Sequence, residues 1–161
     1  MFIRGFFSNV FATLPLSIGI CLASAGANAQ TTETLSFIEK GNFADGSPSY
    51  TNIDLDRPGG SPGDMVVSQS DVLDSATKKP VGHTSGWCVR TWTFKELYEC
   101  TFTLTLADGQ ISVQGPAKRH GETVLAVTGG TGKYSNASGE LKLNMRVGEG
   151  FDNHLVYALR Y

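Results

Sequence analysis

Strict alternation of apolar and polar residues is the feature that most limits how this chain can fold. In residues 99–106 every second residue is apolar, and Glu or Thr stands between them. Residues 140–147 repeat the pattern. In the last segment the apolar and aromatic residues at odd-numbered positions are Phe151, Leu155, Tyr157, Leu159 and Tyr161. Successive side chains of a β-strand point to opposite faces of the sheet. The alternation therefore predicts strands with one apolar face, in a chain whose only long helical period lies in residues 1–29.

Turn-forming residues separate eight segments of strand character. These segments are residues 34–40, 65–73, 80–90, 97–106, 109–115, 123–128, 139–147 and 151–161, with a loop rich in Gly, Pro, Ser and Asp from Asp45 to Pro62. Such spacing is typical of an all-β sandwich or barrel. Closure into a barrel would remove the exposed sheet edges and leave an interior that is either filled or able to hold one small ligand. In the alternative arrangement, the apolar faces point outward and form a subunit interface.

Residues 1–29 have the organisation of a secretory signal peptide. Arg4 precedes a mostly apolar stretch from Val10 to Ala25, and Ala27-Asn28-Ala29 supplies the small residues of a cleavage site before Gln30. We therefore expect a secreted or periplasmic protein whose single domain spans residues 30–161, without a stable membrane anchor. An uncleaved N-terminal anchor is the alternative.

Two cysteines, Cys88 and Cys100, remain after the expected cleavage. They lie on consecutive predicted strands, and a hairpin centred on Phe94 would bring them opposite each other. In an exported protein such a pair favours a disulfide, and two buried thiols are the alternative. With the scattered histidines His83, His120 and His154, these cysteines do not form a ligand set for zinc, so we expect no metal.

Charge and motifs exclude several functions. The formal net charge is −2, and no basic stripe with interleaved aromatic residues is present, so nucleic acid is not an expected partner. The run Gly129-Gly130-Thr131-Gly132-Lys133 departs from a phosphate-binding loop, because Val127 replaces its first glycine and Tyr134 its hydroxyl residue. We expect a structural turn there.

Four motifs in order resemble the allene oxide cyclase family. They are Gly63-Asp64, the run Val-Gly-His-Thr-Ser-Gly-Trp-Cys at 81–88, Ile-Ser-Val-Gln-Gly-Pro at 111–116, and Leu-Ala-Val-Thr-Gly-Gly at 125–130. The glycine pattern that follows, ending at Gly139, is also similar to that of dirigent proteins. The resemblance implies a single eight-stranded antiparallel β-barrel with no cofactor.

The same resemblance implies a set of site residues. In the plant cyclases a glutamate on the first strand and a Ser-Pro pair line the cavity, and Glu39 and Ser47-Pro48 stand at that spacing. The glutamate would share a proton with the substrate or stabilise a developing cation, with Pro48 beside the reacting oxygen. A solvent-facing Glu39 is the alternative. A second-strand asparagine of the plant enzymes is Ser70 here, which we expect to bind ligand together with Cys88.

Four aromatic residues are further candidates for the cavity wall, namely Trp87, Trp92, Tyr98 and Tyr157, because aromatic side chains can force a polyene into one folded conformer. Plain core or interface packing is the other interpretation of these residues. We expect a barrel that binds a small apolar or amphipathic molecule and steers an isomerisation or cyclisation. The alternatives are a non-catalytic carrier, a dirigent-like guide for radical coupling by another enzyme, and a filled structural module. A homo-oligomer is also expected if an apolar strand face is exposed.

Overall fold

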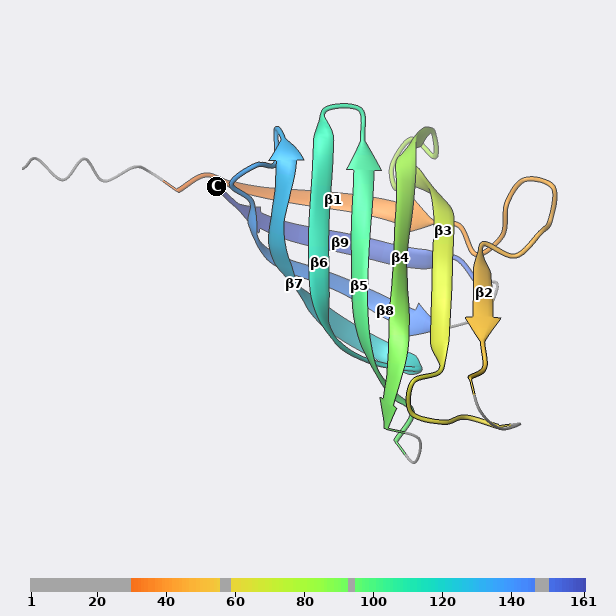
Figure 1. Cartoon of the computed structure of the whole chain (residues 1–161). Helices are drawn as coiled ribbons and strands as arrows, with labels where there is room; N and C mark the ends of the chain where they lie inside the picture. The colour runs from red at the N-terminus through yellow and green to blue at the C-terminus, as the bar shows by residue number, and fades with distance from the viewer. Residues whose placement is uncertain (1–29, 56–58, 93–94, 147–150) are drawn as a thin grey trace, which may run out of the picture.

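Strands account for all the regular secondary structure that the computed structural model describes, which covers residues 30–55, 59–92, 95–146 and 151–161 (Figure 1). The expected signal peptide at 1–29, the hairpin centre at Phe94 and the end of the predicted segment 139–147 lie outside these residues. The strands are β1 (Thr32–Glu39), β2 (Tyr50–Ile53), β3 (Met65–Asp74), β4 (Pro80–Trp92), β5 (Leu97–Leu106), β6 (Gly109–Lys118), β7 (His120–Gly132), β8 (Ser138–Arg146) and β9 (Asn153–Arg160).

Eight of the strands form a closed antiparallel barrel. The order of neighbours is β1-β9-β8-β7-β6-β5-β4-β3, and β1 also pairs with β3, where Phe37, Ile38 and Glu39 lie opposite Asp74, Leu73 and Val72. In Figure 1, β1, β9 and β8 cross behind the strands from β3 to β7. The predicted eight-stranded barrel is therefore confirmed.

The ninth strand, β2, corrects the loop predicted from Asp45 to Pro62. Residues Tyr50–Ile53 pair with β3 along its outer edge, outside the closed barrel. Three of its four residues are exposed, so it has no apolar face and no alternating pattern. Backbone hydrogen bonds to the edge of β3 make it a strand, and such bonds leave no trace in hydropathy.

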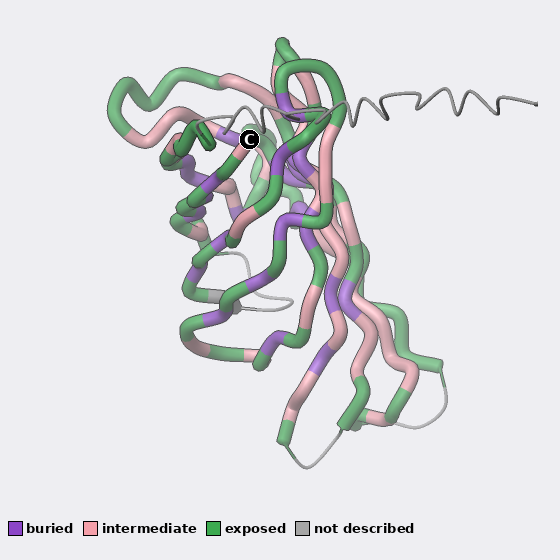
Figure 2. Tube along the Cα trace, turned by 90° about the vertical axis from the view of Figure 1, so that its left-hand side faces the viewer, coloured by how far each residue is buried: buried purple, intermediate pink, exposed green. Residues whose placement is uncertain are grey.

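Alternate residues of each barrel strand fill the interior. Along β9 the burial of the described side chains alternates residue by residue, and Figure 2 shows the same alternation of buried and exposed positions on the neighbouring strands. Burying a Leu or Ile side chain contributes about 1.5–3 kcal/mol. The fully buried core includes Leu104, Ile111, Val113, Leu125, Leu141, Tyr157 and Leu159.

The glycine-rich run after Val127 is a backbone requirement of the barrel. Gly130 lies at the end of β7, where a Cβ atom would stand 2.2 Å from the carbonyl oxygen of Gln110 on β6. Gly132 has φ +58° and precedes the turn into β8. Only a residue without a side chain fits the first position, and the second conformation favours glycine. The run is therefore structural, but its glycines lie within β7 and the predicted turn begins only at Lys133.

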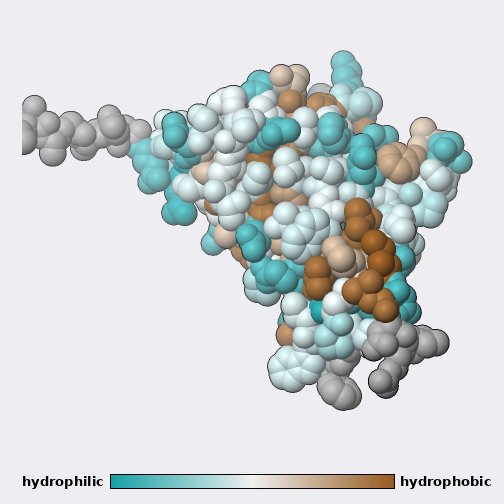
Figure 3. Space-filling model, in the orientation of Figure 1, coloured by the Kyte–Doolittle hydropathy of each residue, from teal (hydrophilic) through white to brown (hydrophobic). Residues whose placement is uncertain are grey.

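Large apolar side chains are exposed on the outer face of β2, β3 and β4. Ile53, Val67 and Trp87 belong to these strands, and Leu55 follows β2. In Figure 3 brown atoms gather on the side of the molecule where β2 and β3 lie. A homo-oligomer stays a prediction, which the mass of the protein in solution will test. The described part of the chain contains no helix long and apolar enough to cross a membrane.

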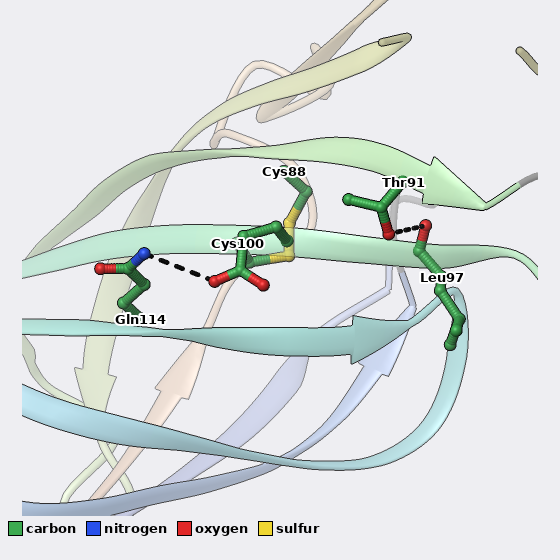
Figure 4. The surroundings of a disulfide bond; sticks show 6 residues. Cys88, Thr91, Leu97, Cys100 and Gln114 are labelled. Atoms are coloured by element: carbon green, nitrogen blue, oxygen red, sulfur yellow. Dashed lines mark hydrogen bonds between the residues drawn. A yellow bond between two sulfur atoms is a disulfide. The ribbon is translucent and has the colours of Figure 1, made fainter. Parts of the chain in front are cut away.

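The hairpin of β4 and β5 carries a disulfide. Cys88 and Cys100 lie directly opposite each other in the register, with Cα atoms 4.1 Å apart, and both are buried. Figure 4 shows the bond between the two strands, near the hydrogen bond from Thr91 Oγ1 to the carbonyl oxygen of Leu97. The predicted pairing of these cysteines is confirmed.

Reduction of this disulfide should lower the free energy of unfolding by roughly 3 kcal/mol, since the bond closes a short loop in the unfolded chain. Urea unfolding of the oxidised protein and of the Cys88→Ala/Cys100→Ala variant measures the difference. Equal midpoints and slopes for the two proteins would contradict the expectation.

Candidate functional site

A cavity opens to solvent at one end of the barrel interior. The space open to the centre of a water molecule is about 60 Å³. Side chains of β1, β2, β3, β4, β5, β8 and β9 line the cavity, together with the connection that follows β1. Its apolar lining includes Val66, Phe102, Leu141, Leu143 and Leu155, and its polar lining includes Glu39, Ser49, Ser70, Thr84 and Asn153.

Glu39 is the carboxylate of this cavity, and side chains from two other strands hold it in place. Thr84 Oγ1 donates to its Oε1 at 2.5 Å, and Asn153 Nδ2 donates to its Oε2 at 2.9 Å. Glu39 is the last residue of β1, whereas Thr84 lies on β4 and Asn153 begins β9. Hydrogen bonds to a carboxylate are stronger than those between neutral groups, so the three side chains form one oriented unit.

Two polar atoms in the same lining are buried without a partner. They are the hydroxyl oxygen of Tyr157 and Oδ1 of Asn153. Because Asn153 turns its amide nitrogen toward Glu39, its carbonyl oxygen points away from the carboxylate. A buried polar atom without a partner costs about 1–3 kcal/mol, and such atoms are rare in native proteins.

Burial raises the pKa of Tyr157 far above the ordinary phenol value, and the charge of Glu39 raises it further. The phenol therefore keeps its proton at neutral pH and remains a hydrogen-bond donor. Its ring is fixed by an edge-on contact with Phe37, with ring centres 6.1 Å apart. An aromatic contact of this kind adds about 0.5–1.5 kcal/mol beyond area burial.

Ion pairing organises the rim of the cavity. Lys40 donates from Nζ to Asp152 at 2.5 Å, and the backbone nitrogen of Gly41 donates to the same carboxylate at 3.1 Å. Desolvation raises the pKa of Asp152, but these bonds outweigh it and the pKa lies below the ordinary value. Ser49 Oγ donates to the carbonyl oxygen of Gly41 at 2.9 Å. The chain around the mouth is thereby held to the start of β9.

Four of the residues proposed from sequence lie together in the cavity lining, namely Glu39, Ser70, Cys88 and Tyr157. Cys88 contributes as half of the disulfide. Pro48 and Trp87 instead line a shallow groove on the outer surface. Ser47 is exposed and donates to Asp45 at 2.6 Å. Reversal of the chain between β1 and β2 sends the Ser47-Pro48 pair outward and turns buried Ser49 toward the cavity.

Sequence reasoning missed Thr84 and Asn153 as members of this site, whereas Tyr157 was among the aromatic residues expected at the cavity wall. A weak signal was present for both missed residues, since Thr84 shares the strand parity of Cys88 and Asn153 shares that of Leu155. An odd or even position in a strand tells which face of the sheet a side chain is on. It does not tell which inward-pointing side chains contact one another. No cluster of three His, Cys, Asp or Glu side chains that could hold a metal ion occurs among the described residues.

Tyr157→Phe should leave the free energy of unfolding of the empty protein unchanged or raise it by up to about 2 kcal/mol, because it removes a buried hydroxyl that has no partner. Thermal and denaturant unfolding of the two proteins measure the effect. A clear loss of stability would mean that the hydroxyl has a stabilising partner in solution.

Comparisons with known proteins agree with this fold. The sequence profile of the allene oxide cyclase family matches residues 28–160. A structure described as pyocyanin demethylase is 27% identical, with a TM-score of 0.63 over 80% of this chain and 99% of the other. A pterocarpan synthase dirigent protein (15% identity, TM-score 0.62, coverage 81% and 84%) and an exo-specific intermolecular Diels-Alderase (14%, 0.59, 83% and 99%) share the fold. The chain belongs to the allene oxide cyclase family.

Proposed function

We propose that this barrel binds a small apolar or amphipathic molecule in the cavity and steers its isomerisation or cyclisation. The observation that carries the proposal is the oriented carboxylate of Glu39 inside a largely apolar lining that opens to solvent. Ligand pockets typically combine apolar walls with a few well-placed polar groups.

The proposed reaction uses the apolar lining of the cavity and the carboxylate of Glu39. Apolar side chains such as Phe102 and Leu143 would hold a flexible substrate in one folded conformer, which brings its reacting ends together. Glu39 would then stabilise positive charge that develops as bonds rearrange, or take a proton from one atom and return it to another. Both routes are isomerisations, so atoms and electrons balance within the substrate itself.

The comparisons support cyclisation by analogy through the Diels-Alderase, which is built on a similar barrel. A pyocyanin demethylase and a dirigent protein with similar barrels have other functions. One fold hosts many functions, so the residues of this cavity carry the argument and the neighbours strengthen it.

A non-catalytic carrier or a dirigent-like guide is the second candidate. The hydrogen bonds of Glu39 favour it, because each carboxylate oxygen already accepts a bond from Thr84 or Asn153. In this alternative the carboxylate connects three strands around the cavity, and the ligand is bound without being transformed.

Export is the remaining part of the proposal. Arg4, the apolar stretch and Ala27-Asn28-Ala29 support a signal peptide over residues 1–29. When the full chain is expressed in a Gram-negative host, mass spectrometry of the periplasmic fraction should find a protein that begins at Gln30. A cytoplasmic protein that retains residues 1–29 would contradict export.

Binding should depend on the open cavity. A hydrophobic naphthalene fluorophore should bind the oxidised protein, and Ser70→Leu should weaken binding at least 5-fold, because Ser70 is buried and lines the cavity. Asp71→Leu is the matched control, since Asp71 is the exposed neighbour on the same strand and should leave binding unchanged. Equal affinities for the two variants would place the fluorophore elsewhere.

Catalysis should depend on Glu39. We would add the mature protein to an allene oxide generated in situ from a fatty-acid hydroperoxide and measure the enantiomers of the cyclic product. If Glu39 transfers a proton, the unmodified protein should give one enantiomer in excess. In Glu39→Gln the rate should fall 10²- to 10⁴-fold and the enantiomeric excess should fall with it, while the fluorophore affinity stays unchanged.

Glu33→Gln serves as the control for this assay, because Glu33 lies on the same strand, bonds to Lys133 and is not a lining residue of the cavity. It should retain the excess of the unmodified protein. A racemic product with every protein would contradict catalysis on this substrate. The protein would then act on another substrate or serve as a carrier.

A further inference from the structure

Tyr157 is the largest fully buried side chain in the described part of the chain, and its hydroxyl makes no hydrogen bond there. Two other tyrosines have partners, since Arg90 Nη2 donates to the hydroxyl of Tyr98 at 2.7 Å and the hydroxyl of Tyr161 donates to Glu33 at 2.6 Å. A phenylalanine would fill the position of Tyr157 without burying an unpaired hydroxyl. The hydroxyl therefore suggests a role that the empty protein does not satisfy.

The surroundings of Tyr157 suggest what would satisfy it. The residue forms part of the cavity lining together with Glu39 and Asn153. Thr84 and the amide nitrogen of Asn153 are directed to the carboxylate of Glu39, so neither is aimed at the phenol. The hydroxyl is closed to solvent in the empty protein, so a molecule that enters the cavity would reach it by displacing the side chains that cover it.

We propose that the Tyr157 hydroxyl is a specificity-determining donor that binds a neutral carbonyl or ether oxygen of the molecule held in the cavity. This inference rests on the proposed binding function and narrows it to oxygen-bearing apolar ligands. Tyr157 contacts the ligand and selects it by hydrogen bonding, whereas Glu39 carries the charge that the reaction uses.

The protonation state of Tyr157 and the charge beside it determine which kind of ligand oxygen the hydroxyl can bind. Burial and the negative charge of Glu39 both raise the pKa of the phenol, so the group keeps its proton and can donate it in a hydrogen bond. The same negative charge would repel a ligand carboxylate placed at the phenol. A ketone, ester carbonyl, ether or epoxide oxygen fits both conditions.

Two probes of nearly equal shape separate the hydrogen bond from apolar packing. They are 2-acetylnaphthalene, which has a carbonyl group, and 2-isopropenylnaphthalene, which has a methylene group in place of the oxygen. We would measure the affinity of both probes for the oxidised protein, for Tyr157→Phe and for Tyr98→Phe. The ratio of the ketone to the alkene affinity removes the difference in hydrophobicity between the probes.

We expect Tyr157→Phe to lower this ratio about 3- to 10-fold through weaker ketone binding, with alkene affinity unchanged, since a net hydrogen bond contributes a factor of this order. Tyr98→Phe removes a hydroxyl from a tyrosine that does not line the cavity and should leave the ratio unchanged. An unchanged ratio in Tyr157→Phe, or an equal fall in both variants, would overturn the proposal.

A measurement on the unmodified protein gives an independent check. The carbonyl stretch of bound 2-acetylnaphthalene should lie at lower frequency than in hexane, and it should return toward the hexane value in Tyr157→Phe. A bound carbonyl at the hexane value in the unmodified protein would refute the hydrogen bond while leaving ligand binding intact. If neither naphthalene nor the fluorophore binds at all, the proposed binding function fails, and the role of Tyr157 fails with it.

Discussion

Pairing between β1 and β3 is the contact on which the rest of the structure depends. It consists of three residue pairs, from Phe37 with Asp74 to Glu39 with Val72, and it turns an open sheet into a closed barrel. Without it, β1 and the end of β3 would present free edges and the apolar face would be open to solvent. Val72 and Phe37 are buried at this junction. The junction also positions the site, because Glu39 is one of its residues.

Part of the barrel interior is filled by packed side chains, and the rest forms the cavity. Leucine and isoleucine side chains such as Leu104, Ile111 and Leu125 are fully buried and fill much of the barrel. The remaining space is lined by Glu39 and its partners, and it contains the unpaired oxygen atoms of Asn153 and Tyr157. Unpaired buried groups lower the stability of the empty protein, and binding sites commonly retain such a cost because the groups are completed by a ligand.

Much of the fold could be predicted from local pattern. Alternation located the strands around Cys100, Leu141 and Tyr157, and the pairing of the two cysteines followed from the hairpin expected between β4 and β5. Two features were out of reach. The edge strand β2 has no apolar face, and β7 extends from His120 to Gly132 where only residues 123–128 had strand character, because its ends are held by backbone pairing with β8 and β6.

Local order along the chain therefore determined which residues form strands, which face of each is apolar and which cysteines meet, since these depend on period-two geometry and on neighbours in one hairpin. The tertiary structure alone decided how the sheet closes and what surrounds Glu39. Its partners are 45 and 114 residues away in sequence. Contacts over such separations arise from the order and stagger of strands in a closed sheet, and no local pattern encodes them. For the same reason, Pro48 lies outside the barrel. Trp87 also lies outside, but local alternation decides this, because its neighbour Cys88 points inward.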